Sequence, residues 1–95
     1  MDVASHLDRF FKEISVDARV TATHISVYAA ILQSLRKVGT GRLSMFGFEL
    51  MQVAKISSGK TYYKAIRELS AFGYICYEPS FNKNQPSKIS LPNRG

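Results

Sequence analysis

Cysteine and histidine, which often define the chemistry of small proteins, are scarce in this chain. Cys76 is the only cysteine, so no internal disulfide can form. His6 and His24 are the only histidines, which leaves a zinc site without enough ligands. We therefore expect no metal and no cofactor, and we interpret Cys76 as a small apolar strand residue, the ordinary role of a free cysteine.

Long hydrophobic runs are also missing. The longest nearly apolar stretch, from Ile25 to Leu35, contains Ser26, Gln33 and Ser34 and falls short of the roughly 20 apolar residues that a membrane crossing requires. The first residues lack the basic-then-apolar pattern of a secretory signal, since Asp2 is acidic. The expectation is a cytoplasmic protein that has no membrane partner.

Acidic residues are outnumbered, with 7 against 13 lysines and arginines, which gives a net charge of +6. Such a surplus favours an anionic partner, although it can also serve solubility alone. Most of the excess lies in residues 57–95, which hold six basic and two acidic residues. A chain of 95 residues that is 45% hydrophobic is typical of one folded globular domain.

No catalytic constellation is evident, because the carboxylates are scattered and neither histidine belongs to a motif with serine or cysteine. The stretch Gly59-Lys60-Thr61 matches the end of a phosphate-binding loop. That loop requires a glycine where this chain has Ala54, and it must follow a buried strand rather than the helix that the pattern predicts here. We therefore expect that the protein is not an enzyme.

Apolar residues spaced three and four apart predict a first helix from about Asp2 to Ser15. The apolar stripe fits packing on the protein's own core as well as the seam of a homodimer, and two heptads do not decide between them. The candidate dimerisation residues are Val3, Leu7, Phe10, Phe11 and Ile14.

A second helix follows, capped by Thr21 or Thr23 and ended by the glycines at 39 and 41. Residues 42–46 alternate and predict a short extended segment, and a brief helix is expected at about 48–55. The second helix is predicted to be apolar on two sides, and one of these sides includes Val27, Ile31 and Val38. The brief helix is expected to bury Leu50, Met51, Val53 and Ala54.

A longer helix begins at Ser57 or Ser58 and continues to Phe72, after which Gly73 ends it. Its expected inward face consists of Tyr62, Ala65, Ile66 and Leu69. Beyond Gly73 the period changes to alternation, so residues 74–78 and 88–91 predict two strands that pair as a hairpin with a long tip at 79–87.

The order of these elements and the residues themselves resemble the winged helix-turn-helix family. The run from Ser58 to Leu69 followed by Phe72-Gly73-Tyr74-Ile75 resembles a pattern common to bacterial winged-helix regulators. The stretches THISVYAAILQ, KISSGKTYYKAIRELSAFGYI and EPSFNKNQPSKISL are similar to short regulators encoded on bacterial conjugative and mobilisable elements. The resemblance covers about residues 21–91.

The resemblance implies an α+β, mainly α fold with a three-helix core, a β-hairpin wing and an extra N-terminal helix. It also implies that residues 1–20 form the N-terminal helix, residues 21–92 the winged helix-turn-helix domain and residues 93–95 a tail. Its expected function is sequence-specific binding of double-stranded DNA, as a transcriptional regulator or a mobile-element accessory factor. With no ligand-binding domain attached, we expect no small-molecule ligand.

A DNA major groove admits one α-helix, so the outer face of helix 58–72 is the candidate reader. Its candidate DNA-binding residues are Ser58, Gly59, Lys60, Thr61, Tyr63, Lys64 and Arg67. The wing candidates are Asn82, Lys83, Asn84 and Lys88. Arg67, one turn further on, is assigned to phosphate. Two other interpretations stay open: an ordinary solvated surface, and a protein-interaction module that uses exposed Tyr63, Tyr74 and Phe81.

Overall fold

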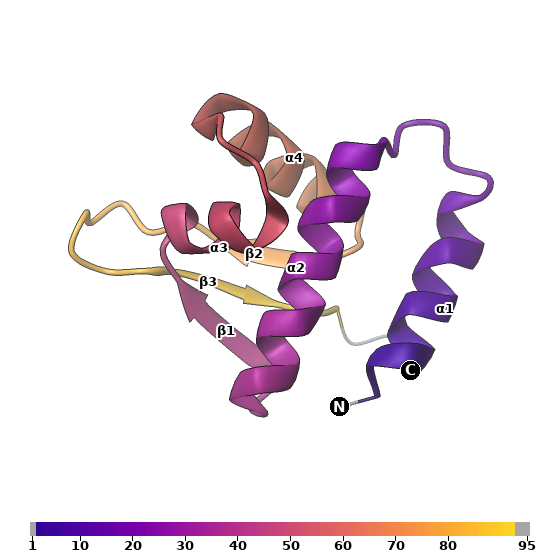
Figure 1. Cartoon of the computed structure of the whole chain (residues 1–95), viewed down its shortest axis with the longest axis horizontal. Helices are drawn as coiled ribbons and strands as arrows, with labels where there is room; N and C mark the ends of the chain where they lie inside the picture. Colours follow the sequence, from indigo (N-terminus) through magenta and orange to yellow (C-terminus); the bar gives the residue numbers. More distant parts are fainter. Residues whose placement is uncertain (1, 93–95) are drawn as a thin grey trace.

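The computed structural model describes residues 2–92 and shows a small, mainly helical α+β fold, as predicted (Figure 1). The elements in these residues are α1 (Val3–Ile14), α2 (Ala22–Val38), β1 (Arg42–Met45), α3 (Gly47–Ala54), α4 (Gly59–Ala71), β2 (Cys76–Glu78) and β3 (Ser87–Ser90). None of the helices in this part of the chain combines the length and hydrophobicity that a bilayer crossing needs. The predicted tail, 93–95, lies outside the described residues.

The helix ends follow local sequence signals. Thr21 is the N-cap of α2, and Ser58 is the N-cap of α4, where its Oγ accepts a hydrogen bond from the Thr61 amide at 3.2 Å. At the far end of α4, Gly73 takes a left-handed φ of 89°. The Tyr74 amide then donates to the Leu69 carbonyl at 2.9 Å, which closes the helix and turns the chain towards the sheet.

The sheet is antiparallel with β3 in the centre, in the order β1-β3-β2. The predicted hairpin is confirmed, because β2 pairs with β3 and Tyr77 lies opposite Ile89. The pairing of β1 with β3, which sets Leu43 opposite Ile89 as well, was not predicted. The first strand of the hairpin is also shorter than expected. Tyr74 and Ile75 precede it and are both buried rather than alternating.

Helix α2 crosses the middle of the molecule and packs against α3, α4 and β1 (Figure 1). Its central residues Ile31, Leu32 and Leu35 have no exposed surface. Two predicted core positions are wrong, since Val38 is 49% and Val53 is 47% exposed. Val38 is the last residue of α2, and α3 buries the side that carries Leu50 and Ala54 while Val53 flanks it.

Helix α1 packs on the chain's own core. Phe10 is 2% exposed, stacks on the ring of Tyr28 with centroids 3.8 Å apart and meets Tyr74 edge-on at 5.3 Å. Val3, Leu7 and Ile14 pack partly buried against the same core, whereas Phe11 remains 49% exposed. The structure thus shows the intramolecular role of the stripe. Homodimerisation stays a prediction, for which Phe10 has almost no surface to offer.

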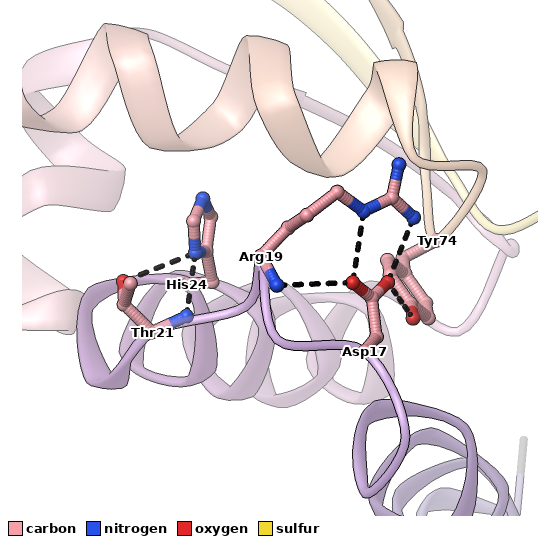
Figure 2. A network of polar contacts seen from close by, with 5 residues as sticks. All are labelled: Asp17, Arg19, Thr21, His24 and Tyr74. Atoms are coloured by element: carbon pink, nitrogen blue, oxygen red, sulfur yellow. Dashed lines mark hydrogen bonds and ion pairs between the residues drawn. The ribbon is translucent and has the colours of Figure 1, made fainter.

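The connection between α1 and α2 is held by a polar network (Figure 2). The Asp17 carboxylate accepts two hydrogen bonds from the Arg19 guanidinium, each 2.8 Å long, and one from the Tyr74 hydroxyl at 2.7 Å. The guanidinium also lies 4.0 Å from the centroid of the Phe72 ring. These contacts fasten the connection to the end of α4.

The same network shifts two pKa values. Hydrogen bonds from Arg19 and then from Tyr74 hold the pKa of the Asp17 carboxyl well below its ordinary 3.8. Burial, reinforced by the hydrogen bond to Asp17, raises the pKa of Tyr74 to about 12. Asp17 is therefore ionised and Tyr74 neutral throughout the neutral range, and each stabilises the form of the other that makes this contact.

Candidate nucleic-acid interface

Helix α4 has one buried and one exposed side. The predicted inward residues Tyr62, Ala65, Ile66 and Leu69 are all no more than 3% exposed, which confirms that side. The predicted outward residues lie on the surface of the molecule. Those exposed are Ser58, Lys60, Thr61, Tyr63, Lys64 and Arg67, and Gly59 is partly exposed.

The only carboxylate of α4 is directed at a neighbouring helix. Oε1 of Glu68 lies 3.1 Å from Nε2 of His24 in α2. Within residues 2–92, no carboxylate oxygen lies within 4.0 Å of the charged groups of Lys60, Lys64 or Arg67. The outer surface of α4 therefore presents three positive charges that have no ion-pair partner among the described residues.

His24 connects α2 to α4 at this point, and it is only 4% exposed. Its Nδ1 accepts a hydrogen bond from the backbone amide of Thr21 at 2.8 Å (Figure 2). An amide N–H can only donate, so the neutral ring carries its proton on Nε2 and donates it to Glu68. One side chain thus caps α2 and sets the position of α4 against it.

Tyr63 lies over the start of α3 rather than standing free. A Cβ on Gly47 would be 2.8 Å from Cζ of the Tyr63 ring, nearer still to its hydroxyl oxygen, and 3.4 Å from the ring of Tyr62. The absence of a side chain at Gly47 therefore makes room for Tyr63, which is 38% exposed. The ring of Tyr63 therefore packs against the first residue of α3 and joins α4 to α3.

Gly59 has no such structural duty. A Cβ built at this position meets nothing within 4 Å. The fold would therefore accept a side chain in the first turn of α4. This leaves open the interpretation that a small residue here serves the approach of a ligand.

The loop between β2 and β3 protrudes from one side of the molecule (Figure 1). Three of the candidate wing residues, Asn82, Lys83 and Asn84, lie exposed in it, and Lys88 lies exposed in β3. The side-chain oxygen of Asn82 accepts a hydrogen bond from the Asn84 amide at 3.0 Å. Asn82 therefore shapes the loop with its carbonyl group, while Lys83 presents charge.

Two shallow grooves join this loop to the helices. The first has Phe48 and Met51 of α3, Tyr63 of α4 and the loop residues Asn82 and Lys83 among its lining. The second runs beside the C-terminal half of α4. Its lining includes Arg67, Tyr77, Pro79 and Phe81. The loop thus borders α4 at Tyr63 and at Arg67.

Phe48 is a surface residue that the sequence reasoning missed. Its side chain is 64% exposed, and its ring stacks on Phe46 at 5.6 Å between centroids. The expected helix was assigned only an inward face, so Phe48 received no role. The signal available in the sequence was a second aromatic two residues from Phe46 and outside the spacing of Leu50 and Ala54.

Tyr74 is not the exposed aromatic that the protein-interaction interpretation requires. Its side chain is 8% exposed and donates its hydroxyl proton to Asp17. The prediction of an exposed Tyr74 is wrong because the turn at Gly73 directs the chain across the core before β2 begins. Phe81, in contrast, is exposed as that interpretation requires.

Groups that could hold a metal do not gather in the described part of the chain, where no three histidine, cysteine, aspartate or glutamate side chains come together. Cys76 lies in β2, in the strand predicted for it, and is exposed. The chemistry offered by the surface described above is therefore that of amides, hydroxyls, cations and aromatic rings.

Comparisons with known proteins add no relative: no protein-family model, curated protein or solved structure matches this chain.

Proposed function

We propose that this chain is a winged helix-turn-helix protein that binds double-stranded DNA sequence-specifically. In this proposal α3 and α4 are the helix-turn-helix, α4 enters the major groove, and the loop between β2 and β3 is the wing. The order α2, β1, α3, α4, β2, β3 and the antiparallel pairing of β2 with β3 support this architecture. The proposal is also motivated by the resemblance of Ser58–Leu69 and Phe72–Ile75 to winged-helix regulators.

One observation carries the proposal: the outer side of α4 is cationic, and the only acid of the helix is turned towards α2. Lys60, Lys64 and Arg67 are exposed, whereas Glu68 contacts His24. A solvated helix surface usually mixes charges of both signs, which gives it little net attraction for a polyanion. The exposed side of α4 carries three cations against one partly exposed acid that contacts His24, which leaves a net attraction for phosphate.

In this proposal the position of each residue decides whether it contacts a base edge or the phosphate backbone. Lys60, Thr61 and Lys64 lie in the first turns of α4, which meet base edges when such a helix docks in the major groove. Arg67 lies one turn further on, beside the loop, where it would contact the phosphate backbone. Lys83 and Lys88 would hold the flanking DNA, and Gly59 would let the backbone approach closely.

The test is a comparison of two triple variants of equal charge. The first is K60A/K64A/R67A, and the matched control is R9A/R36A/K37A, whose three cations are exposed on α1 and at the end of α2. Duplexes are enriched from a randomised pool by the wild-type protein, and binding is measured by fluorescence anisotropy. The first variant should lose at least about 100-fold in affinity and the control little. Equal affinities would refute the proposal.

Salt dependence gives a second reading of the same contacts. If about five of the cations neutralise phosphates, the logarithm of affinity should fall with the logarithm of salt concentration with a slope near −4 to −5. The K60A/K64A/R67A variant should flatten the slope by about 1, because Arg67 is the one residue of the three assigned to phosphate and each lost phosphate contact removes about one unit. A slope near zero in the wild type would contradict DNA binding.

As a DNA-binding domain, the protein would act as a transcriptional regulator or as an accessory factor of a mobile element. A homodimer on a palindromic site would add affinity and specificity. The enriched sequences test this directly. Two inverted half-sites indicate a dimer, and a single half-site indicates a monomer.

A second candidate function is a winged-helix module that binds protein, favoured by the exposed aromatic rings of Phe48 and Phe81. Exposed aromatic residues are enriched in protein interfaces. In that case the protein would co-purify with a defined partner and shift no duplex. Alanine at Phe48 would then release the partner, while K60A/K64A/R67A would retain it.

A further inference from the structure

We propose that the ring of Phe81 is a wedge that inserts between base pairs in the DNA minor groove and bends the duplex. This inference rests on the proposed DNA-binding function and adds to it a mode of binding for the loop between β2 and β3. It assigns a role to the most exposed large apolar side chain in the described residues.

Phe81 is 98% exposed, so its ring makes almost no contact within the chain. The other exposed phenylalanines are supported by neighbours, since Phe48 stacks on Phe46 and Phe11 lies edge-on to Phe10. Among residues 2–92 no aromatic ring packs against Phe81. A phenyl ring that is wholly in water is unfavourable, and an interaction partner removes that cost.

The loop around Phe81 is held in shape by hydrogen bonds. The Ser80 amide donates to Oγ of Ser87 at 3.2 Å across the base of the loop, and the Asn82 amide donates to Oγ of Ser80 at 3.2 Å. The Gln85 amide donates to the Asn82 carbonyl at 3.0 Å and closes the tip. The residues on both sides of Phe81 are thus fastened, and a preorganised loop presents the ring at lower entropic cost.

The residues that follow Phe81 have the side chains that suit a minor groove. Asn82, Lys83, Asn84 and Gln85 supply amide and ammonium donors, and the described residues contain no acid between Glu78 and the end of the loop. Minor-groove edges of A·T pairs present only acceptors, which amide and ammonium groups can contact. Proteins that bend DNA from this groove combine such donors with an inserted apolar residue, often phenylalanine.

The loop that carries Phe81 borders α4 at Arg67. Phe81 and Arg67 line the same shallow groove, together with Tyr77 and Pro79. A helix in the major groove and a loop in the adjacent minor groove are separated by one phosphate backbone. Arg67 is the cation that lines this groove of the protein, and the phosphate backbone of the DNA would pass beside it.

The experiment uses the duplexes enriched by the wild-type protein, and an unselected duplex of mixed sequence. Affinity is measured by fluorescence anisotropy, the bend by energy transfer between dyes at the duplex ends, and unstacking by the fluorescence of 2-aminopurine placed at each pyrimidine–purine step in turn. The wild type should bend the duplex by roughly 20–90° and brighten one 2-aminopurine.

The variants separate a wedge from a surface contact. F81A should abolish the bend and the 2-aminopurine signal and weaken binding about tenfold, the size of one aromatic–base stack. F81L keeps an apolar wedge and should retain part of the bend. V16A removes a side chain that is 89% exposed in the connection between α1 and α2, and it should change neither the bend nor the affinity.

The outcomes distinguish this inference from the proposed function. Salt-dependent binding of an unbent duplex, with equal affinity for F81A and wild type, overturns the wedge and leaves DNA binding by α4 intact. If F81A instead releases a co-purified protein, the ring is a protein contact and the wedge is overturned. Failure of the wild type to bind any duplex overturns both.

Discussion

At the scale of single residues, polar side-chain contacts fix how the elements meet. His24 receives the Thr21 amide on one ring nitrogen and faces Glu68 with the other. The Asp17 carboxylate accepts hydrogen bonds from the guanidinium of Arg19 and from the hydroxyl of Tyr74. Both clusters join residues far apart in sequence, so each one stabilises the packing of α2 or its preceding connection against α4.

The contact of His24 predicts its tautomer. Because the Thr21 amide donates to Nδ1 at 2.8 Å, the neutral ring should carry its proton on Nε2. A multiple-bond ¹H–¹⁵N spectrum at a pH where the ring is neutral distinguishes the two tautomers by the shifts of the ring nitrogens. His6, in α1, provides the internal comparison. A proton found on Nδ1 of His24 would contradict this geometry.

The contacts of Asp17 predict a pH-dependent contribution to stability. Its pKa is lower in the folded protein than the ordinary 3.8, so the stabilisation is complete above that value and is lost as the pH falls towards the folded pKa. Urea unfolding of wild type and D17N should therefore differ most at neutral pH and converge below about pH 4. Y74F, which lacks one donor to Asp17, should show a smaller difference.

A constant difference between wild type and D17N from neutral to acid pH would show that the network does not depend on the charge of Asp17. Subtracting the two proteins at each pH removes the titration of all groups that they share. The comparison thus isolates the carboxylate that Arg19 and Tyr74 contact.

At the scale of elements, α4 is built as a two-sided helix with a special first turn. Tyr62 and Ile66 hold it against the core, and Lys60 and Lys64 occupy the opposite side. Gly59 begins the helix although alanine would favour it more, and no atom lies where a Cβ would be. Because the helix itself does not require a glycine at this position, we assign Gly59 to the approach of the proposed DNA ligand.

G59A separates these two requirements. Replacing the glycine should leave stability unchanged or raise it by up to about 0.5 kcal/mol, because alanine loses less entropy in a helix. Affinity for the selected duplexes should nevertheless fall, since the methyl group occupies the space through which the DNA backbone approaches. Thermal unfolding and anisotropy titrations measure the two effects. Loss of stability, or unchanged affinity, would contradict this role for Gly59.

At the scale of the whole molecule, one core joins all elements, and α1 belongs to it. The radius of gyration is 12.5 Å, about the value for a compact chain of this length. Phe10 reaches from α1 into the core and meets Tyr28 and Tyr74, so the N-terminal helix is part of the same cooperative unit. We therefore expect α1 to remain packed in a monomer.

F10A tests this packing. Removing the buried ring should lower the free energy of unfolding by about 3–5 kcal/mol, whereas F11A, at the exposed neighbouring position, should cost about 1 kcal/mol or less. Urea unfolding at several protein concentrations provides the measurement, and the midpoint should not depend on concentration. A concentration-dependent midpoint that F10A abolishes would instead assign the ring to a homodimer contact.

The sequence by itself determined the elements and the two sides of α4. Helical spacing from Tyr62 to Leu69, the cap at Ser58 and the stop at Gly73 are local properties, so they could be read without coordinates. Local patterns also predicted the pairing of β2 with β3, because a hairpin joins neighbouring strands. They placed Lys60 on the surface for the same reason that they buried Ile66.

Tertiary structure alone decided which distant residues meet. The burial of Tyr74, the pairing of β1 with β3 and the engagement of Glu68 by His24 each join segments far apart along the chain. No local period encodes such contacts, because they depend on how the elements pack. The exposure of Phe81, in contrast, was expected from the sequence, because turn residues surround it.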